Sequence, residues 1–217
     1  MRRLVTRWGF GDPGTMSTMP ANTRPASLPG NAALLIVDLQ KAIDDPRWAV
    51  DGPRNNPQAE ANIAALLAGW RSTGRPVIHV RHDSQEPGST YHPYGAGHAF
   101  KPEAMPEPGE RVVPKTTNSA FIGTDLDVYL RERDIWVLVI AGVITNNSVE
   151  ATARMAGNLG FDTRVVADAT FTFARRDYAG RLRTAEEVHD MSLANLSGEY
   201  ATIMDTAAVL TALGQTP

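Results

Sequence analysis

Length, charge and composition exclude several classes of protein before any motif is considered. The chain has 217 residues, a formal net charge of -3 at pH 7 and no cysteine. This length suits one α/β domain with a sizeable core, and the charge gives no electrostatic support for binding nucleic acid or a membrane surface. The absence of cysteine excludes disulfides, thiolate metal sites and a cysteine nucleophile. No apolar run approaches the roughly 20 residues that span a bilayer, and no secretory signal is recognisable, so we expect a cytoplasmic protein.

The start of the chain has no hydrophobic periodicity. Residues 1–29 mix Gly, Pro, Thr, Ser and Met, a composition typical of a flexible N-terminal arm. An arm that packs on a partner subunit is the alternative. Residues 30–217 carry the pattern of one folded domain.

Apolar runs after this arm predict alternating strands and helices. Residues 32–38 form a buried strand that ends on Asp38, residues 41–57 form a loop, and an amphipathic helix over residues 58–73 follows. A strand at residues 76–81 lies one crossover away from the first strand, so we expect the two to be parallel.

The longest irregular stretch covers residues 82–108. Its aromatic and histidine side chains, among them Tyr91, His92 and Phe100, favour a lid or a substrate wall over disorder. A surface loop with a few aromatic anchors is an equally good interpretation of any one of them. The histidines have no tight or helical spacing beside an acid, which disfavours a metal site.

The central unit of the chain is a predicted βαβ motif. A continuous apolar strand at residues 135–143 leads into a helix-length segment at residues 144–160 and a second strand at residues 163–167. Ser148 lies in the turn from strand to helix, where backbone N–H groups can stabilise negative charge. An ordinary helix cap is the alternative interpretation of this serine.

The remaining elements are short. We expect them at residues 110–115 (a strand ending on Lys115), 124–133 (a helix capped by Thr124), 181–196 (a helix capped by Thr184), 200–204 (a strand) and 205–213 (a helix).

Three strand ends therefore present polar groups to one edge of the predicted sheet. Asp38, Lys115 and Ser148 all follow buried strands, so a parallel sheet would place them near one pocket. An acid beside a lysine favours the ionised pair, and a hydroxyl at a helix start has donors nearby for a developing oxyanion. This set of residues looks like a catalytic site.

The segments that carry these residues resemble a known family. Residues 34–40, 115–121 and 142–154 are similar to the three signatures of the isochorismatase-like (cysteine hydrolase) family, in the same order and spacing. The resemblance implies a doubly wound, three-layer α/β sandwich with a mainly parallel six-stranded sheet, assembled as a homodimer or homotetramer.

The resemblance also implies roles for the matching residues. Asp38 stands at the position of the general acid or base, Lys115 at that of its supporting cation, and Ser148 where a nucleophilic cysteine attacks an amide carbonyl. It further implies a non-proline cis peptide bond at Val143–Ile144 or Ile144–Thr145, and an oxyanion hole made by backbone N–H groups near Ser148. The segment 51–53 lacks the histidine of the metal-binding nicotinamidases, which disfavours a metal cofactor and nicotinamide as substrate.

Serine at the cysteine position leaves three explanations open. Serine forms an alkoxide with far more difficulty than cysteine forms a thiolate, and no histidine base is evident in the sequence motifs. Ser148 is an engineered replacement of cysteine, a weaker natural acyl acceptor or hydrogen-bond donor, or a bystander in the isochorismatase branch, where the acid protonates a vinyl ether.

The sequence thus predicts a metal-free hydrolase, without a cofactor, that cleaves a C–N amide or ureido bond in a small molecule. A vinyl-ether hydrolase that uses Asp38 alone and a catalytically silent ligand-binding homologue are the rivals. The residues expected to contact substrate come from the loops and from the turn before Ser148: Gln40, Trp48, Tyr91, His92, Phe100, Ile144, Thr145 and Asn147.

Overall fold

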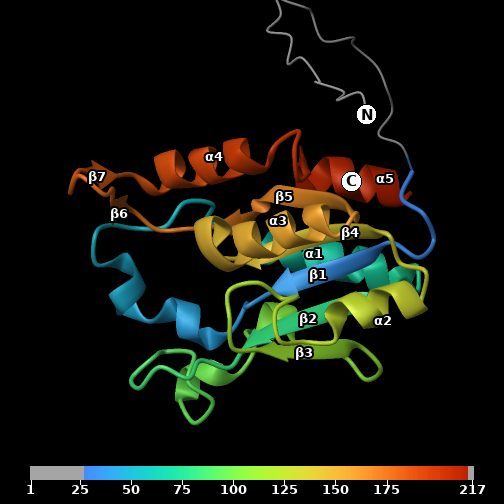
Figure 1. Cartoon of the computed structure of the whole chain (residues 1–217), viewed down its shortest axis with the longest axis horizontal. Helices are drawn as coiled ribbons and strands as arrows, with labels where there is room; N and C mark the ends of the chain where they lie inside the picture. Colours follow the sequence, from blue (N-terminus) through green and yellow to red (C-terminus); the bar gives the residue numbers. More distant parts are fainter. Residues whose placement is uncertain (1–26, 215–217) are drawn as a thin grey trace, which may run out of the picture.

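Six parallel strands form the central sheet. The computed structural model describes residues 27–214 (Figure 1). The strand order is β3-β2-β1-β4-β5-β8, and every neighbouring pair is parallel. The strands are β1 (Ala33–Val37), β2 (Val77–His82), β3 (Arg111–Lys115), β4 (Val137–Val143), β5 (Asp162–Phe171) and β8 (Thr202–Met204).

Helices cover both faces of this sheet. In Figure 1, α2 and α3 lie in front of the sheet and α1 behind it. The two core clusters agree with this arrangement, because one contains side chains of α1 and α5 and the other contains side chains of α2, α3 and α4. The helices are α1 (Ala59–Ser72), α2 (Leu126–Glu132), α3 (Glu150–Asn158), α4 (Ala185–Leu196) and α5 (Thr206–Leu213). The expected three-layer α/β sandwich is confirmed.

Strand β1 shows why the apolar runs are continuous rather than alternating. Leu34 and Ile36 belong to the cluster on the α1 side, and Leu35 and Val37 belong to the cluster on the opposite side. All four side chains are fully buried. A strand covered by helices on both faces has no solvent side for polar residues.

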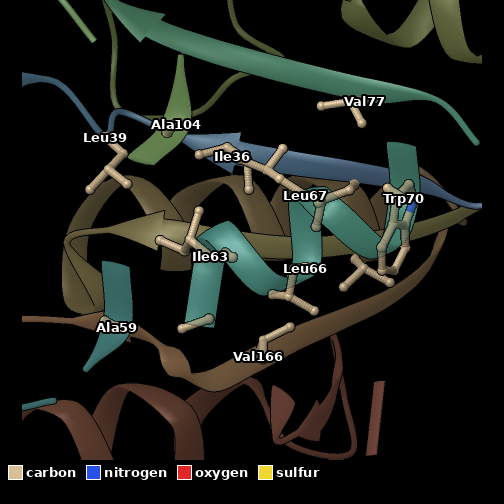
Figure 2. Close-up of a cluster of buried hydrophobic side chains, with 14 of the residues drawn as sticks. Ile36, Leu39, Ala59, Ile63, Leu66, Leu67, Trp70, Val77, Ala104 and Val166 are labelled. Atoms are coloured by element: carbon tan, nitrogen blue, oxygen red, sulfur yellow. The ribbon is translucent and has the colours of Figure 1, made fainter. Parts of the chain in front are cut away.

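Helix α1 packs its predicted apolar face under the sheet (Figure 2). Ile63, Leu67 and Trp70 are buried in the cluster that also contains Ile36. The Trp70 indole N–H donates to the Ala32 carbonyl oxygen at 3.0 Å, which satisfies the polar atom of this large buried side chain.

The strand order reverses between β1 and β4. From β1 the chain builds outward through β2 and β3 on one side, and it then returns to add β4, β5 and β8 on the other. The crevice outside the carboxyl ends of the strands at such a reversal is where open α/β sheets bind ligands.

Several boundaries differ from the prediction. Helix α2 begins at Leu126 with Asp125 at its N-cap, one residue after the predicted cap. The Thr124 hydroxyl donates to the Ala120 carbonyl oxygen and accepts from the Leu126 N–H at 3.4 Å. Strand β5 continues to Phe171, since the Asp168 carboxylate in this strand is satisfied by the backbone N–H and hydroxyl of Thr206.

A small hairpin was not predicted. Strands β6 (Arg175–Arg176) and β7 (Leu182–Arg183) pair antiparallel, and β7 takes up the first residues of the helix expected at residues 181–196. Two-residue strands carry too few positions to show a period. The Thr184 cap of α4 is confirmed, together with the reciprocal hydrogen bond from the Thr184 N–H to the Glu187 side chain.

The folded part of the chain includes Leu28, which was placed in the N-terminal arm. The Leu28 side chain is buried and its N–H donates to the Ala212 carbonyl oxygen in α5. Residues 1–26 of the predicted arm lie outside the described residues. Within residues 27–214, no helix is long and apolar enough to cross a membrane.

Glu110, the residue before β3, makes hydrogen bonds to side chains of both α1 and β2. Its carboxylate accepts hydrogen bonds from Arg71 Nε at 2.8 Å, His79 Nε2 at 2.8 Å and the Glu107 N–H at 2.8 Å. Burial opposes ionisation, but the bonds from Arg71, Glu107 and His79 outweigh it and lower the pKa of Glu110 from 4.5 to about 2.

Glu110→Gln is expected to lower the free energy of unfolding at pH 7 by roughly 2–3 kcal/mol. A depressed carboxyl pKa stabilises the fold above the unfolded value of 4.5, and that stability is lost as pH falls towards about 2. The difference from wild type should therefore shrink between pH 4.5 and pH 2, as measured by denaturant unfolding. Glu107→Gln is the control, because its carboxylate is 58% exposed and pairs with Arg71 at 3.2 Å, a contact worth at most about 1 kcal/mol. Equal losses in the two variants would show that the hydrogen bonds around Glu110 stabilise the fold no more than an exposed ion pair does.

Candidate active site

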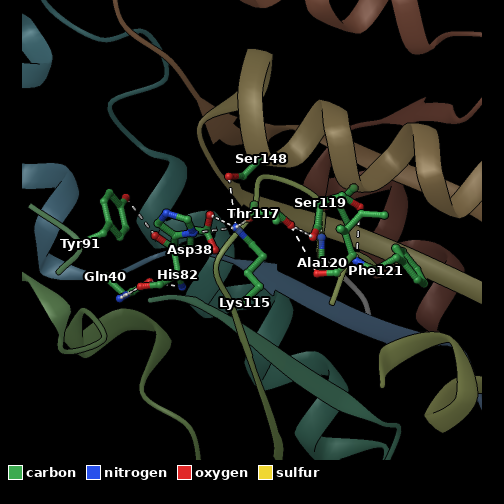
Figure 3. A network of polar contacts seen from close by, with 12 residues as sticks. Asp38, Gln40, His82, Tyr91, Lys115, Thr117, Ser119, Ala120, Phe121 and Ser148 are labelled. Carbon is green, nitrogen blue, oxygen red and sulfur yellow. Dashed lines mark hydrogen bonds and ion pairs between the residues drawn. The ribbon is translucent and has the colours of Figure 1, made fainter. Parts of the chain in front are cut away.

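Three side chains meet at the carboxyl edge of the sheet (Figure 3). Asp38 directly follows β1, and Lys115 is the last residue of β3. Ser148 lies in a π-helical turn (η5, Thr145–Val149) between β4 and α3. All three are buried. The structure thus brings together the residues that the sequence motifs singled out.

Lys115 connects the other two. Its ammonium nitrogen donates to Asp38 Oδ2 at 2.7 Å and to Ser148 Oγ at 3.4 Å. A third hydrogen bond, to the Thr117 carbonyl oxygen, measures 3.0 Å. The lysine nitrogen therefore lies between a carboxylate and a hydroxyl.

Asp38 is in a position to take up a proton. Burial raises the pKa of its carboxyl above the ordinary value, and the charge and hydrogen bond of Lys115 offset only part of this shift. Its second oxygen, Oδ1, is buried and makes no hydrogen bond to the described residues. A carboxyl group with a raised pKa and a free oxygen is suited to general acid–base chemistry.

The backbone of Asp38 is held in an unusual conformation. Its φ is +51°, in the left-handed region that non-glycine residues seldom adopt. The Tyr91 hydroxyl donates to its carbonyl oxygen at 3.2 Å, and its N–H donates to the Val80 carbonyl oxygen at 3.0 Å. Burial raises the pKa of Tyr91 well above its ordinary range, so the phenol keeps the proton that it donates.

Gly142 allows β4 to approach β1 beside Asp38. It pairs with Val37 in the parallel register and has a φ of +119°. A Cβ atom here would overlap the Val37 carbonyl oxygen. The peptide bond between Val143 and Ile144 is cis. This is one of the two positions at which the sequence motif predicts a cis bond.

A cavity of about 100 Å³ opens beside the three side chains. Of the residues expected to contact substrate, Trp48, Tyr91, Ile144 and Asn147 line it together with Asp38 and Ser148. Four further lining residues were not predicted: His82, Ser89, Asn118 and Val143. Trp48 and Tyr91 meet edge to face with their ring centroids 6.0 Å apart, which makes one wall aromatic.

Gln40 does not line the cavity, and its predicted substrate contact is replaced by a structural role. Its side-chain amide is fully buried and bonds to backbone groups on two other segments. Nε2 donates to the carbonyl oxygens of His82 and His98, and Oε1 accepts from the His82 N–H. Gln40 therefore fixes the end of β2 and the long loop beside β1.

Three other predicted contacts also lie outside the cavity lining. Phe100 packs edge to face against His79, and His92 packs against Tyr94. Thr145 Oγ1 lies 2.9 Å from His189 Nδ1, so its hydroxyl is directed towards α4. The sequence could not place these side chains, because loop conformation has no periodicity to read.

Two of the backbone N–H groups near Ser148, where an oxyanion hole is expected, are bonded within the turn. The N–H groups of Asn147 and Val149 both donate to the Ile144 carbonyl oxygen, at 3.1 and 3.4 Å. These two groups on either side of Ser148 are therefore already bonded.

The described residues do not include a cluster of side chains suited to binding a metal ion. No group of three or more His, Cys, Asp or Glu residues suited to a metal ion occurs within residues 27–214. In the cavity Asp38 is paired with Lys115, and in the segment 51–53 Asp51 lies 3.4 Å from the Arg176 guanidinium.

Comparison with known proteins agrees with this architecture. The isochorismatase domain matches residues 32–208 of the chain. The chain belongs to the isochorismatase family. A crystal structure of an isochorismatase-family protein from Chromobacterium violaceum has a TM-score of 0.85 and 56% sequence identity, and covers 90% of this chain and 99% of its own.

Two curated relatives extend the comparison within this family of hydrolases. The isochorismatase family protein YrdC of Bacillus subtilis (strain 168) is 45% identical over 174 residues, which are 80% of this chain and 91% of YrdC. The ureidoacrylate amidohydrolase RutB of Methylobacterium radiotolerans is 31% identical over 230 residues, which cover 90% of this chain and 85% of RutB.

Gly142→Ala is expected to destabilise this isochorismatase-family fold by about 3 kcal/mol or more, because strain at positive φ adds to a clash with Val37. Gly109→Ala is the matched control, since Gly109 has a φ of +93° with no neighbour within 4 Å of a Cβ atom. The control should lose about 1–2 kcal/mol from backbone strain alone. Denaturant unfolding measures both, and similar losses would show that the close approach of β4 to β1 does not require glycine.

Proposed function

We propose that this hydrolase cleaves a C–N amide or ureido bond of a small molecule. Asp38 transfers protons, Lys115 stabilises developing charge and Ser148 accepts the acyl group. The observation that carries the proposal is the position of the Lys115 ammonium, 2.7 Å from Asp38 Oδ2 and 3.4 Å from Ser148 Oγ, beside a cavity of about 100 Å³.

The proposed reaction has two stages. Ser148 Oγ attacks the carbonyl carbon while its proton passes to the Asp38 carboxylate, and Lys115 remains a cation throughout. The C–N bond then breaks as the leaving nitrogen takes the proton from Asp38, which leaves an ester on Ser148. Water then attacks the ester carbonyl while Asp38 takes its proton, and Asp38 returns that proton to Ser148 Oγ as the acid is released. The raised pKa of Asp38 supports this role, because it makes the carboxylate a stronger base than an exposed aspartate.

The charges around the cavity favour a neutral acyl group. Among the described lining residues there is no arginine or lysine, and the nearby Lys115 is balanced by Asp38. The other polar lining groups are hydroxyls, amides and an imidazole. A cavity of about 100 Å³ beside Ser148 suits the reacting end of a small substrate. The amidohydrolase among the relatives is consistent with amide chemistry.

The vinyl-ether rival has less support from this lining. Isochorismate carries two carboxylates, and no unpaired cation among the described lining residues would receive them. Vinyl-ether hydrolysis would require Asp38 but not Ser148, so substitution of Ser148 distinguishes it from amide hydrolysis. The silent-homologue rival predicts no turnover at all.

Ser148→Ala is expected to abolish hydrolysis of small neutral amides and ureides, with a loss on the order of 10³-fold or more, because the acyl acceptor is removed. Asp38→Asn should lose activity to a similar degree. The readout is amine or ammonia release from a panel that includes acetamide, isobutyramide and N-methylurea, with isochorismate as the vinyl-ether probe. Ser119→Ala and Asp44→Asn are the matched controls; Ser119 lies outside the cavity lining, and the Asp44 carboxylate is exposed and pairs with Lys101.

The outcomes separate the rivals. Activity that survives Ser148→Ala but not Asp38→Asn would support the acid-only route. If neither the wild type nor Ser148→Cys turns over any member of the panel, the silent ligand-binding homologue is favoured. Retained activity in Asp38→Asn would refute the assignment.

The proposal also covers the cellular location and the oligomeric state of the enzyme. We place it in the cytoplasm as a homodimer or homotetramer that acts on a small molecule, without a role in binding nucleic acid or membranes. Self-association is supported by Tyr178, Leu182 and Met191, large apolar side chains that are exposed on the hairpin region and α4. Light scattering of the purified chain should give two or four times the mass of one chain, and a monomer would contradict this part.

A further inference from the structure

A histidine outside the three sequence motifs faces the same cavity. His82 is the last residue of β2 and lines the cavity with Asp38 and Ser148. Gln40 holds its backbone on both sides, with Oε1 accepting from the His82 N–H at 2.7 Å and Nε2 donating to the His82 carbonyl oxygen at 3.1 Å. The ring packs edge to face on Tyr91, with centroids 5.6 Å apart. Its position is therefore set by buried neighbours.

The hydrogen bonds of Lys115 determine which ring nitrogen carries a hydrogen. The ammonium group has three N–H bonds, and Asp38 and Thr117 take the two shortest contacts. The third has two acceptors within reach, Ser148 Oγ and His82 Nδ1, each 3.4 Å from the nitrogen. An ammonium group only donates, so Nδ1 is an acceptor and the neutral ring carries its hydrogen on Nε2.

The environment of His82 keeps the ring neutral. Burial, followed by the charge of Lys115, lowers the pKa of His82 below its ordinary value. The carboxylates of Asp38 and Asp83 act in the opposite direction without reversing the shift. Asp83 is itself paired with Arg81 at 2.8 Å.

Several other donors around the cavity are already bonded to protein atoms. The N–H groups of Asn147 and Val149 are bonded to Ile144, and the Trp48 indole N–H is bonded to the Ala42 carbonyl oxygen at 3.0 Å. The Tyr91 hydroxyl is bonded to Asp38. The side chains of Asn118 and Asn147 can donate, but both residues are exposed. His82 is a lining residue that can donate and whose position is fixed by Gln40 and Tyr91.

We propose that His82 is a further catalytic residue, whose Nε2–H donates a hydrogen bond to the carbonyl oxygen of a neutral amide or ureide bound beside Ser148. This inference rests on the function proposed above. His82 transfers no proton. As the Ser148 Oγ–carbon bond forms, the carbonyl π electrons move to the oxygen, and the hydrogen bond from Nε2 strengthens as negative charge develops there.

Two substitutions distinguish this role from a purely structural one. The side-chain nitrogen of His82→Gln can occupy the place of Nε2, whereas the amide of His82→Asn reaches only the place of Nδ1. The proposal predicts that His82→Gln keeps kcat within about tenfold of wild type, and that His82→Asn loses roughly 10²-fold in kcat with a smaller change in KM. His92→Gln, a histidine outside the cavity lining, is the control and should match wild type.

The reverse order would overturn the proposal. Equal activity of the two variants, or higher activity of His82→Asn, would show that His82 acts through Lys115 alone or not at all. Thermal unfolding of each variant checks that the fold is kept.

A measurement on the wild-type protein tests the tautomer independently of activity. Long-range proton–nitrogen correlation spectra at pH 7, with the His82 signals assigned by their loss in His82→Gln, should show hydrogen on Nε2 and none on Nδ1. Hydrogen on Nδ1 would refute the inference. Failure of the proposed function has a different signature, because wild-type enzyme would then release no amine from any amide while the tautomer result still stands.

Discussion

The ion pair of Lys115 and Asp38 joins the carboxyl ends of β3 and β1, two strands that β2 separates in the sheet. The oxygen and nitrogen atoms are 2.7 Å apart and their side chains are 5% and 0% exposed, so both charges have been taken out of water. A buried pair of this kind is stable only when its geometry is good and further hydrogen bonds support it. Thr117 provides one such bond to the lysine, while Asp38 Oδ1 is left without a partner among the described residues. The pair is therefore well held but incomplete, and the missing interaction lies on the atom best placed to take up a proton.

The topology of the sheet brings other polar side chains close to this ion pair. Because the strand order reverses between β1 and β4, the turn after β4 and the end of β1 lie beside the crevice at this reversal. Gly142 permits the close approach of the two strands, and the π-helical turn that follows directs Ser148 towards Lys115. The same arrangement brings the end of β2, and with it His82 Nδ1, to within 3.4 Å of the lysine nitrogen. Membership of the isochorismatase family makes the protein a hydrolase, and the charge balance of the cavity supports our proposal of a small neutral substrate.

The sequence predicts the layers and the ends of the strands better than it predicts the loops. A polar residue at the end of a buried strand, or in the turn that follows it, has to lie at the edge of the sheet. Asp38 and Lys115 stand at strand ends and Ser148 in the turn after β4, so all three could be found without coordinates. Loop side chains obey no such rule, and Phe100 turns towards the core rather than the cavity. His82 was missed because the second strand was predicted to end at residue 81, one residue too early. The same strand-end argument, applied one position later, would have identified it.

Covalent capture tests the role of Ser148 as acyl acceptor most directly. A small activated ester such as 4-nitrophenyl acetate should acylate the enzyme faster than the ester product is hydrolysed, so that acid quenching traps the intermediate. Peptide mapping by mass spectrometry is predicted to find one acetyl group on the peptide that contains Ser148, and none on that peptide in Ser148→Ala. An enzyme that hydrolyses amides without this adduct, or that carries the acetyl group on another residue when Ser148 is absent, would contradict this role.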